Sequence, residues 1–109
     1  MKLESLKKRM QFGGSQKLML RYPNSEIVLC TPLHRLEEEV GECRLRDYVV
    51  AIREVAENYG VPVCDLYANC NMQPQLQENM ERFMPDGLHP NDEGQAKIYK
   101  RLRGFLEAL

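Results

Sequence analysis

Two short apolar runs constrain the fold of this chain more than any other feature. The first is residues 26–31 (EIVLCT), which follows a polar YPNS segment and precedes a proline. The second is residues 61–66 (VPVCDL), with Pro62 near its start, where a missing N–H group is tolerated. Apolar runs without polar alternation are typical of strands that are buried on both faces of a parallel sheet. The sequence therefore predicts two such strands.

The segment between these runs has helical periodicity. Apolar side chains recur at steps of three or four residues from Leu45 to Tyr59, and charged side chains fall at most of the other positions. Gly60 can adopt the left-handed conformation that ends helices, and Pro62 prevents continuation. A strand, a helix and a strand in this order form a βαβ unit, whose crossover is expected to be right-handed.

A second helix is predicted at the C-terminus. Asn91 is a favoured N-cap residue, and Asp92 and Glu93 in the first turn complement the positive end of the helix dipole. The apolar face of this segment comprises Ile98, Leu102, Phe105, Leu106 and Leu109. We expect a terminal helix that packs on the sheet.

The remaining segments carry weaker patterns. Residues 1–22 have helical spacing in part, but Gly13 and Gly14 interrupt it, which predicts a broken helix. Residues 67–85 are polar and loop-like, with one or two helical turns expected within residues 74–82.

Composition permits an enzyme and excludes some partners. The chain has 109 residues, 43% of them hydrophobic, which is enough for one modest core. Its net charge of -1 provides no positive field for binding a run of phosphates, so we expect no nucleic-acid partner. No stretch approaches the roughly 20 apolar residues of a membrane span, and residues 1–10 lack the apolar block of a signal peptide. We expect the chain as given to be cytoplasmic.

The four cysteines are Cys30, Cys43, Cys64 and Cys70. No two of them are separated by two intervening residues, as the cysteines of a zinc knuckle are. Cys30 and Cys64 lie in the apolar runs, where a cysteine is usually a small buried hydrophobic residue. The alternative is a structural zinc site formed by Cys30, His34, Cys43 and Cys70. We expect reduced thiols and no metal.

A carboxylate and an imidazole lie three residues apart, immediately before the terminal helix. A tight turn at Gly87 would fold Asp86 back so that its carboxylate accepts a hydrogen bond from Nδ1–H of His89, leaving Nε2 as a general base. Pro90 favours an extended backbone at His89. In the alternative reading, Asp86 only closes the turn and His89 is an exposed loop residue.

The run PDGLHPNDEGQAKIYKRL (Pro85 to Leu102) resembles the last conserved block of the SGNH hydrolases, which are the GDSL-type esterases and lipases. The segments YPNSEIVLCTP (residues 22–32) and AIREVAENYGVPVCDLY (residues 51–67) also fall in that family's order and spacing. The resemblance implies that Asp86 and His89 are the acid and the base of a Ser-His-Asp triad.

The resemblance extends from about residue 12 to the end of the chain. It implies a three-layer α/β/α sheet of flavodoxin-like type, of which this chain would be the C-terminal half. Residues 1–109 are therefore expected to form a single partial α/β domain. No cofactor is implied.

The sequence lacks the family's G-D-S nucleophile block and its G-x-N-D asparagine. The run FGGS (residues 12–15) is the nearest match to G-D-S. We reject Ser15 as the nucleophile, because no strand precedes it and too few residues separate it from Glu26 to form the intervening elements. Asn69 and Asn71 follow a strand end, but nothing marks either as an oxyanion donor.

Three other groups of residues were considered as functional. His34 and Arg35 follow the first strand and could face a substrate, although a solvated loop pair is the simpler reading. Residues 37–39 (EEE) are expected to form an exposed acidic patch, because they lack calcium-site spacing. The methionines near the candidate site, Met72, Met80 and Met84, could form an acyl-chain surface, but methionines more commonly fill gaps under a loop.

These observations lead to a hydrolysis hypothesis and two alternatives. The parent activity is expected to be carboxylic ester hydrolysis, with His89 and Asp86 present and the serine absent, so that the isolated chain is inactive. Alternatively, the chain is a non-catalytic fragment that self-associates, or one half of a split hydrolase that acts on an ester only with a complementing N-terminal half. We expect a homo-oligomer, most simply a dimer, because the strand at residues 27–31 lacks a partner on one side.

Overall fold

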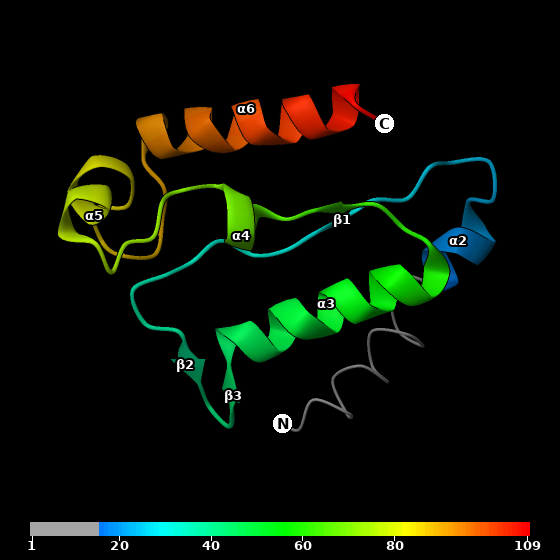
Figure 1. The fold of residues 1–109 in the computed structure, drawn as a ribbon, viewed down its shortest axis with the longest axis horizontal. Helices are drawn as coiled ribbons and strands as arrows, with labels where there is room; N and C mark the ends of the chain where they lie inside the picture. The colour runs from blue at the N-terminus through cyan, green and yellow to red at the C-terminus, as the bar shows by residue number, and fades with distance from the viewer. Residues whose placement is uncertain (1–15) are drawn as a thin grey trace. The chain divides into compact units, whose positions relative to one another are not determined.

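The computed structural model describes residues 16–109 and divides into two compact units (Figure 1). The first unit comprises the chain up to Thr31 together with Glu39–Val63. The second comprises Pro32–Glu38 and Cys64–Leu109. Most of the helix predicted in residues 1–22 lies outside the described residues, and its described part is α2 (Gln16–Arg21). The expected single partial domain stays a prediction.

Helix α3 (Leu45–Tyr59) confirms the predicted amphipathic helix of the first unit. Its buried face consists of Val49, Ala51, Val55 and Ala56. The helix ends at Gly60, which has the left-handed φ of 65° and donates its N–H to carbonyl oxygens of the last turn. At the other end, the backbone N–H of Arg44 donates to the Asp47 carboxylate at 2.9 Å, as in a capping box.

A short hairpin before α3 was not predicted. Strands β2 (Glu39–Val40) and β3 (Cys43–Arg44) pair antiparallel, with Glu39 opposite Arg44. Gly41, in the connecting turn, has a φ of 63°, a conformation that favours glycine. The three glutamates expected to form one acidic patch are therefore divided: Glu37 and Glu38 lie in a loop, and Glu39 lies in β2.

Strands β1 (Leu29–Cys30) and β4 (Val63–Cys64) pair with each other, but both are shorter than predicted. The backbone N–H of Leu29 donates to the Pro62 carbonyl at 3.0 Å. Prolines at positions 32 and 62 lack the N–H needed to extend the ladder, which explains the shortening. The expected burial on both faces is wrong for Cys30, which is exposed. Cys64 is buried as expected.

The second unit is built from three helices: α4 (Leu66–Asn69), α5 (Gln77–Phe83) and α6 (Asp92–Glu107). Helix α5 confirms the helical turns expected near residues 74–82. Helix α4 was missed, and Leu66 belongs to it rather than to a strand. Asp65 explains the change, because its side chain accepts the N–H of Ala68 at 3.2 Å and begins the helix.

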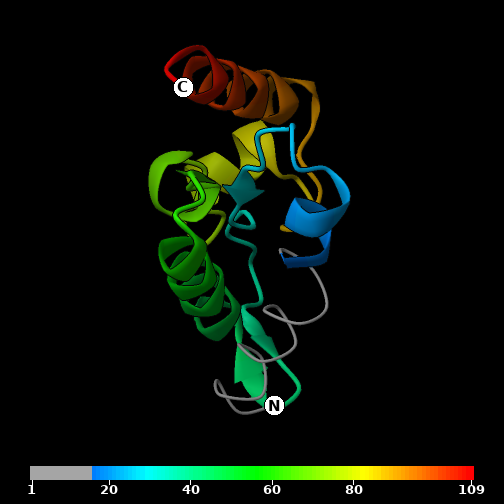
Figure 2. The same ribbon diagram turned by 90° about the vertical axis from the view of Figure 1, so that its right-hand side faces the viewer.

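Helix α6 packs against α4 and α5 (Figure 2). It begins as predicted, since the Asn91 side chain accepts the N–H of Gly94 at 3.0 Å. The core of this unit contains Cys70, Met72, Phe83 and Met84, with Leu33, Leu66 and Ile98 packed against it. Met72 and Met84 therefore belong to the core rather than to an exposed acyl-chain surface, and Met80 is half-buried.

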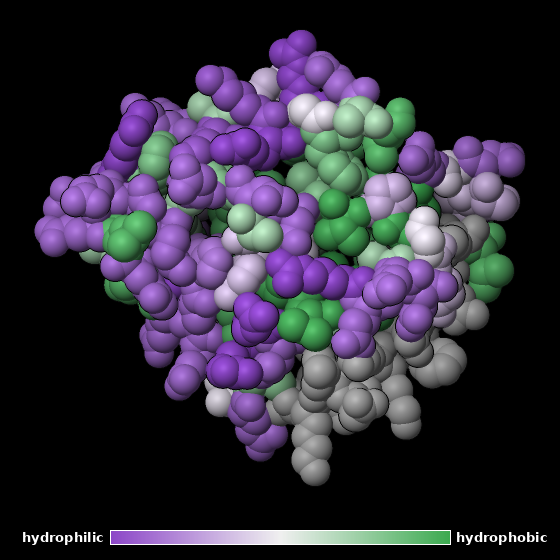
Figure 3. All heavy atoms as spheres, viewed as in Figure 1, coloured by the Kyte–Doolittle hydropathy of each residue, from purple (hydrophilic) through white to green (hydrophobic). Residues whose placement is uncertain are grey.

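The C-terminal half of α6 keeps part of its apolar face exposed. Tyr99, Leu106 and Leu109 are about half exposed or more. Figure 3 shows hydrophilic residues over much of this view, with hydrophobic side chains among them. Among residues 16–109, no helix has both the length and the apolar character that crossing a membrane requires.

Candidate active site

The turn between α5 and α6 brings Asp86 and His89 together. One carboxylate oxygen of Asp86 accepts the backbone N–H groups of Leu88 and His89, at 2.8 and 2.7 Å. The other oxygen lies 2.6 Å from Nδ1 of His89. Gly87 has a φ of 75°, which allows the chain to fold back between the two side chains. All these contacts lie within the second unit.

The hydrogen bonds of this turn set the charge of the pair. The pKa of the Asp86 carboxyl lies well below its usual range, because the carboxylate accepts hydrogen bonds from the His89 backbone, the His89 side chain and the Leu88 backbone. An ionised carboxylate can only accept, so Nδ1 of His89 carries the hydrogen and the neutral ring keeps its lone pair on Nε2. The His89 side chain is 76% exposed, which leaves Nε2 accessible.

The turn is fixed to both of its neighbouring helices and to a distant loop. The N–H of Gly87 donates to the Met84 carbonyl at 2.8 Å. The carbonyl of Gly87 accepts the N–H of Leu36 at 2.7 Å. Asn91 donates its own N–H to the Phe83 carbonyl at 2.8 Å. The position of Asp86 and His89 is therefore determined by backbone hydrogen bonds on each side of the turn.

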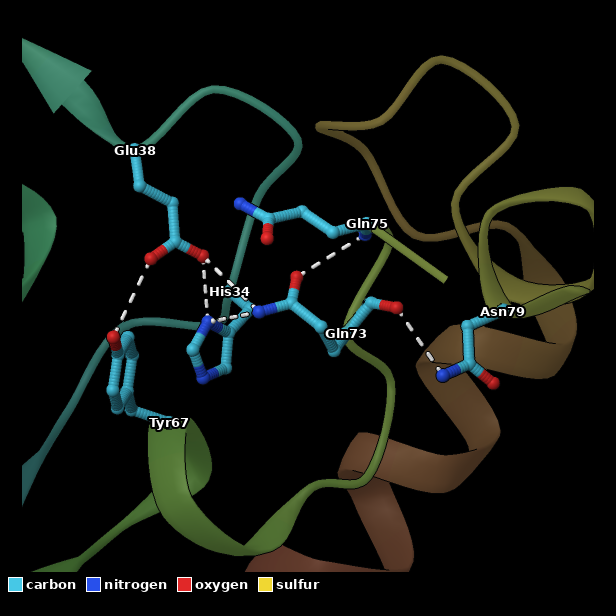
Figure 4. Close-up of polar contacts among 6 residues, drawn as sticks. All are labelled: His34, Glu38, Tyr67, Gln73, Gln75 and Asn79. Atoms are coloured by element: carbon cyan, nitrogen blue, oxygen red, sulfur yellow. Dashed lines mark hydrogen bonds and ion pairs between the residues drawn. The ribbon is translucent and has the colours of Figure 1, made fainter. Parts of the chain in front are cut away.

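A second histidine lies in a cluster of polar side chains that sequence analysis did not predict (Figure 4). The cluster consists of His34, Glu38, Tyr67 and Gln73, and we call it the His34 cluster. Nδ1 of His34 lies 2.6 Å from Glu38 Oε2, and the His34 and Tyr67 rings stack with centroids 3.7 Å apart. The Tyr67 hydroxyl donates to Glu38 Oε1 at 3.3 Å.

The His34 cluster corrects two expectations. The His34 side chain is 23% exposed and the Glu38 side chain 18%, so neither belongs to a solvated loop pair or to a fully exposed acidic patch. Arg35 is also half-buried, and within the described residues its buried Nε has no hydrogen-bond partner. The only signal in the sequence was a histidine near an acidic run. That signal did not identify Tyr67 and Gln73 as the residues that contact His34.

Comparison with known proteins identifies the family. Residues 15–97 match the model of the GDSL-like lipase/acylhydrolase family. The chain belongs to this family. It is 29% identical over 76 residues to an acetylxylan esterase of Xylanibacter ruminicola, a match that covers 67% of this chain and 15% of that protein.

Two solved structures share the fold of this GDSL-family chain. One has a TM-score of 0.80 at 28% identity, over 98% of this chain and 52% of the other. The second, a protein from Lactobacillus plantarum, has a TM-score of 0.77 at 25% identity, over 85% of this chain and 49% of its own. The chain thus spans about half the length of these structures. The expected α/β class with parallel strands is confirmed.

Of the three other residues named for the GDSL site, the structure describes two. Ser15 lies outside the described residues. Asn69 is exposed at the end of α4, and the carbonyl of Asn71 accepts a hydrogen bond from Lys97 Nζ at 2.8 Å. Within residues 16–109, no three side chains of His, Cys, Asp or Glu are grouped as metal ligands.

Proposed function

We propose that this chain supplies the base and its orienting carboxylate to a serine-dependent ester hydrolase. The observation that carries the proposal is the 2.6 Å contact between His89 Nδ1 and Asp86 Oδ2, with Nε2 left accessible. Membership of the GDSL-like lipase/acylhydrolase family supports this reaction class. The acetylxylan esterase relative supports an acetyl ester of a carbohydrate as the substrate.

The reaction follows from the protonation state of the pair. A serine hydroxyl attacks the ester carbonyl while His89 Nε2 takes its proton, and Asp86 stabilises the imidazolium that forms. The imidazolium then donates the proton to the leaving alcohol. Water, activated by the same Nε2, releases the acid from the acyl-serine. Because the sequence contains no G-D-S block, we propose that the serine comes from another polypeptide segment.

The proposal predicts that the isolated chain does not hydrolyse esters. Losing a triad nucleophile costs on the order of a millionfold in rate, roughly 8 kcal/mol of barrier. Turnover of an aryl acetate by the isolated chain should equal that of His89→Ala. Adding a polypeptide that carries the G-D-S half of a GDSL hydrolase should restore turnover, and His89→Ala should abolish it. Asn58→Ala, an exposed position on α3, is the control.

Two outcomes would contradict this assignment. Saturable turnover by the isolated chain that His89→Ala abolishes would mean that the chain holds its own nucleophile, with Ser15 as the first suspect. Restored turnover that survives His89→Ala would remove His89 from the reaction.

We also propose self-association as the property of the isolated chain. Strand β1 has one hydrogen-bonded neighbour within residues 16–109, and unpaired strand edges favour pairing with another copy. Light scattering at micromolar concentration should therefore return at least a dimer. Proline at Val28 should dissociate or unfold it, whereas Glu37→Lys, at an exposed position, should not. A folded monomer would refute this proposal.

A further inference from the structure

The His34 cluster takes no part in the proposed proton transfers, yet its side chains are held in place from several sides. Gln73 is fixed by two hydrogen bonds: its Oε1 accepts the N–H of Gln75 at 3.2 Å, and its carbonyl accepts Asn79 Nδ2 at 3.2 Å (Figure 4). The stacked ring of Tyr67 restricts His34. Side chains fixed in this way lose little freedom when a ligand binds.

The hydrogen bonds of the cluster determine which nitrogen of His34 is available. Glu38 accepts from the Tyr67 hydroxyl, and its other oxygen lies 2.6 Å from His34 Nδ1, so that nitrogen is the donor. The Gln73 amide nitrogen lies 2.8 Å from the same Nδ1, but it is itself a donor and cannot bond to a nitrogen that carries a hydrogen. With Nδ1–H directed to Glu38, the amide therefore donates to the same Glu38 oxygen, at 3.5 Å. The neutral ring therefore carries its lone pair on Nε2, for which the described residues offer no hydrogen-bond partner.

The cluster lies on a segment that contacts the turn of the candidate active site. Leu36, two residues after His34, donates its N–H to the Gly87 carbonyl at 2.7 Å. An ideal Cβ built on Gly87 would lie 2.7 Å from the Leu36 Cβ. The loop that carries His34 and the turn that carries Asp86 and His89 are thus in direct backbone contact within the second unit.

We propose that His34 binds a hydroxyl group of the alcohol part of the ester substrate. The inference rests on the proposed hydrolase function and assigns a residue to recognition of the polyol part of its substrate. A hydroxyl can donate its hydrogen to His34 Nε2, the acceptor that the cluster leaves open. A hydrocarbon chain offers no such donor, and it would desolvate the Glu38 carboxylate without replacing its hydrogen bonds to water.

The two histidines of the chain allow this binding to be observed without catalysis. Each gives one imidazole Cε1–H signal in an NMR spectrum, and His89→Ala assigns them. Titration with xylobiose, a neutral and hydroxyl-rich disaccharide, should shift the His34 signal saturably. Butyl acetate at the same concentration should leave the His34 signal in place.

Matched glutamate variants test the role of the carboxylate. Glu38→Gln replaces one carboxylate oxygen with an NH2 donor, so the side chain can no longer accept from both His34 and Tyr67, and the change should weaken xylobiose binding about tenfold or more. Glu37→Gln, an exposed neighbour that makes the same chemical change, should leave binding unchanged. If Glu38→Gln does not fold, Tyr67→Phe retains the stacked ring and removes the hydroxyl that donates to Glu38, and it should also weaken binding.

Several results would overturn the inference. One is a His34 signal that xylobiose does not move. Others are an equal response to butyl acetate, or a Glu38→Gln variant that binds xylobiose as the wild type does. If Glu38→Gln lowers the melting temperature and the wild type does not bind xylobiose, the His34 cluster only stabilises the fold. Failure of the proposed hydrolase function would appear elsewhere, in the His89-dependent turnover of an aryl acetate, which contains no sugar.

Discussion

Replacing Gly87 with alanine tests whether backbone contact with Leu36 holds the Asp86–His89 turn in place. Gly87 has a φ of 75°, so an alanine there carries about 1 kcal/mol of left-handed strain. Its Cβ would also lie 2.7 Å from Leu36 Cβ, and Cβ cannot move away by a rotamer change. Relief requires backbone movement, which would stretch the hydrogen bond from Leu36 N–H to the Gly87 carbonyl.

The magnitude follows from adding these effects. Overpacking in a fixed site costs about 1–3 kcal/mol. Together with the strain, Gly87→Ala should lower the free energy of unfolding by about 3 kcal/mol. Gly60→Ala is the matched control, because Gly60 has a φ of 65° and no atom within 4 Å of its ideal Cβ. Gly60→Ala should lower the free energy of unfolding only by the cost of the left-handed conformation, about 1 kcal/mol.

Urea unfolding followed by circular dichroism measures both variants, and a second substitution locates the clash. In a Leu36→Gly background, where Leu36 Cβ is absent, Gly87→Ala should cost about as little as Gly60→Ala. In a Leu36→Ala background, where Cβ remains, most of the penalty should persist. The reasoning would be refuted if Gly87→Ala and Gly60→Ala lowered the free energy of unfolding equally. It would also be refuted if Gly87→Ala lowered that free energy as much in the Leu36→Gly background as in the wild type.

Three further predictions concern charge, capping and thiol reactivity. Because the folded pKa of the Asp86 carboxyl lies below its unfolded value, its stabilising contribution is present above about pH 4 and is lost as the pH falls further. Urea unfolding of Asp86→Asn should therefore depend less on pH in that acidic range than unfolding of the wild type does, and an identical dependence would contradict this. Asn91→Ala should lower the unfolding free energy by about 1 kcal/mol, while Asn91→Asp, which keeps the capping oxygen, should lose less, as thermal melts will show. Burial raises the pKa of the Cys70 thiol, so under native conditions Ellman's reagent should modify exposed Cys30 first and Cys70 last, an order that the Cys30→Ser and Cys70→Ser variants identify.

Short-range features of this chain were predictable because their causes lie within a few residues. Helices α3 and α6 followed from periodicity and from their end residues, Gly60 and Asn91. The Asp86–His89 contact also spans three residues, so turn chemistry alone indicated it. The catalytic role of that pair stays a prediction, as does the source of the serine.

Features that depend on pairing between distant segments were predicted poorly. The two apolar runs are continuous, yet β1 and β4 contain two residues each, because strand length depends on the hydrogen bonds a partner can make. The exposure of Cys30 was not predicted either, since an apolar run does not reveal which elements cover the faces of its strand.

Helices α3 and α6, their ends and the fold of the 86–89 turn could be predicted from the sequence, because local backbone preferences and side-chain hydrogen bonds act over a few residues. The His34 cluster depends on tertiary packing, because His34 and Gln73 meet across 39 positions of the chain. Such a contact has no local signature, because it forms only when the loop after β1 packs beside α4 and the segment before α5. The same packing converts Glu38 from an apparent surface charge into the carboxylate that orients a histidine.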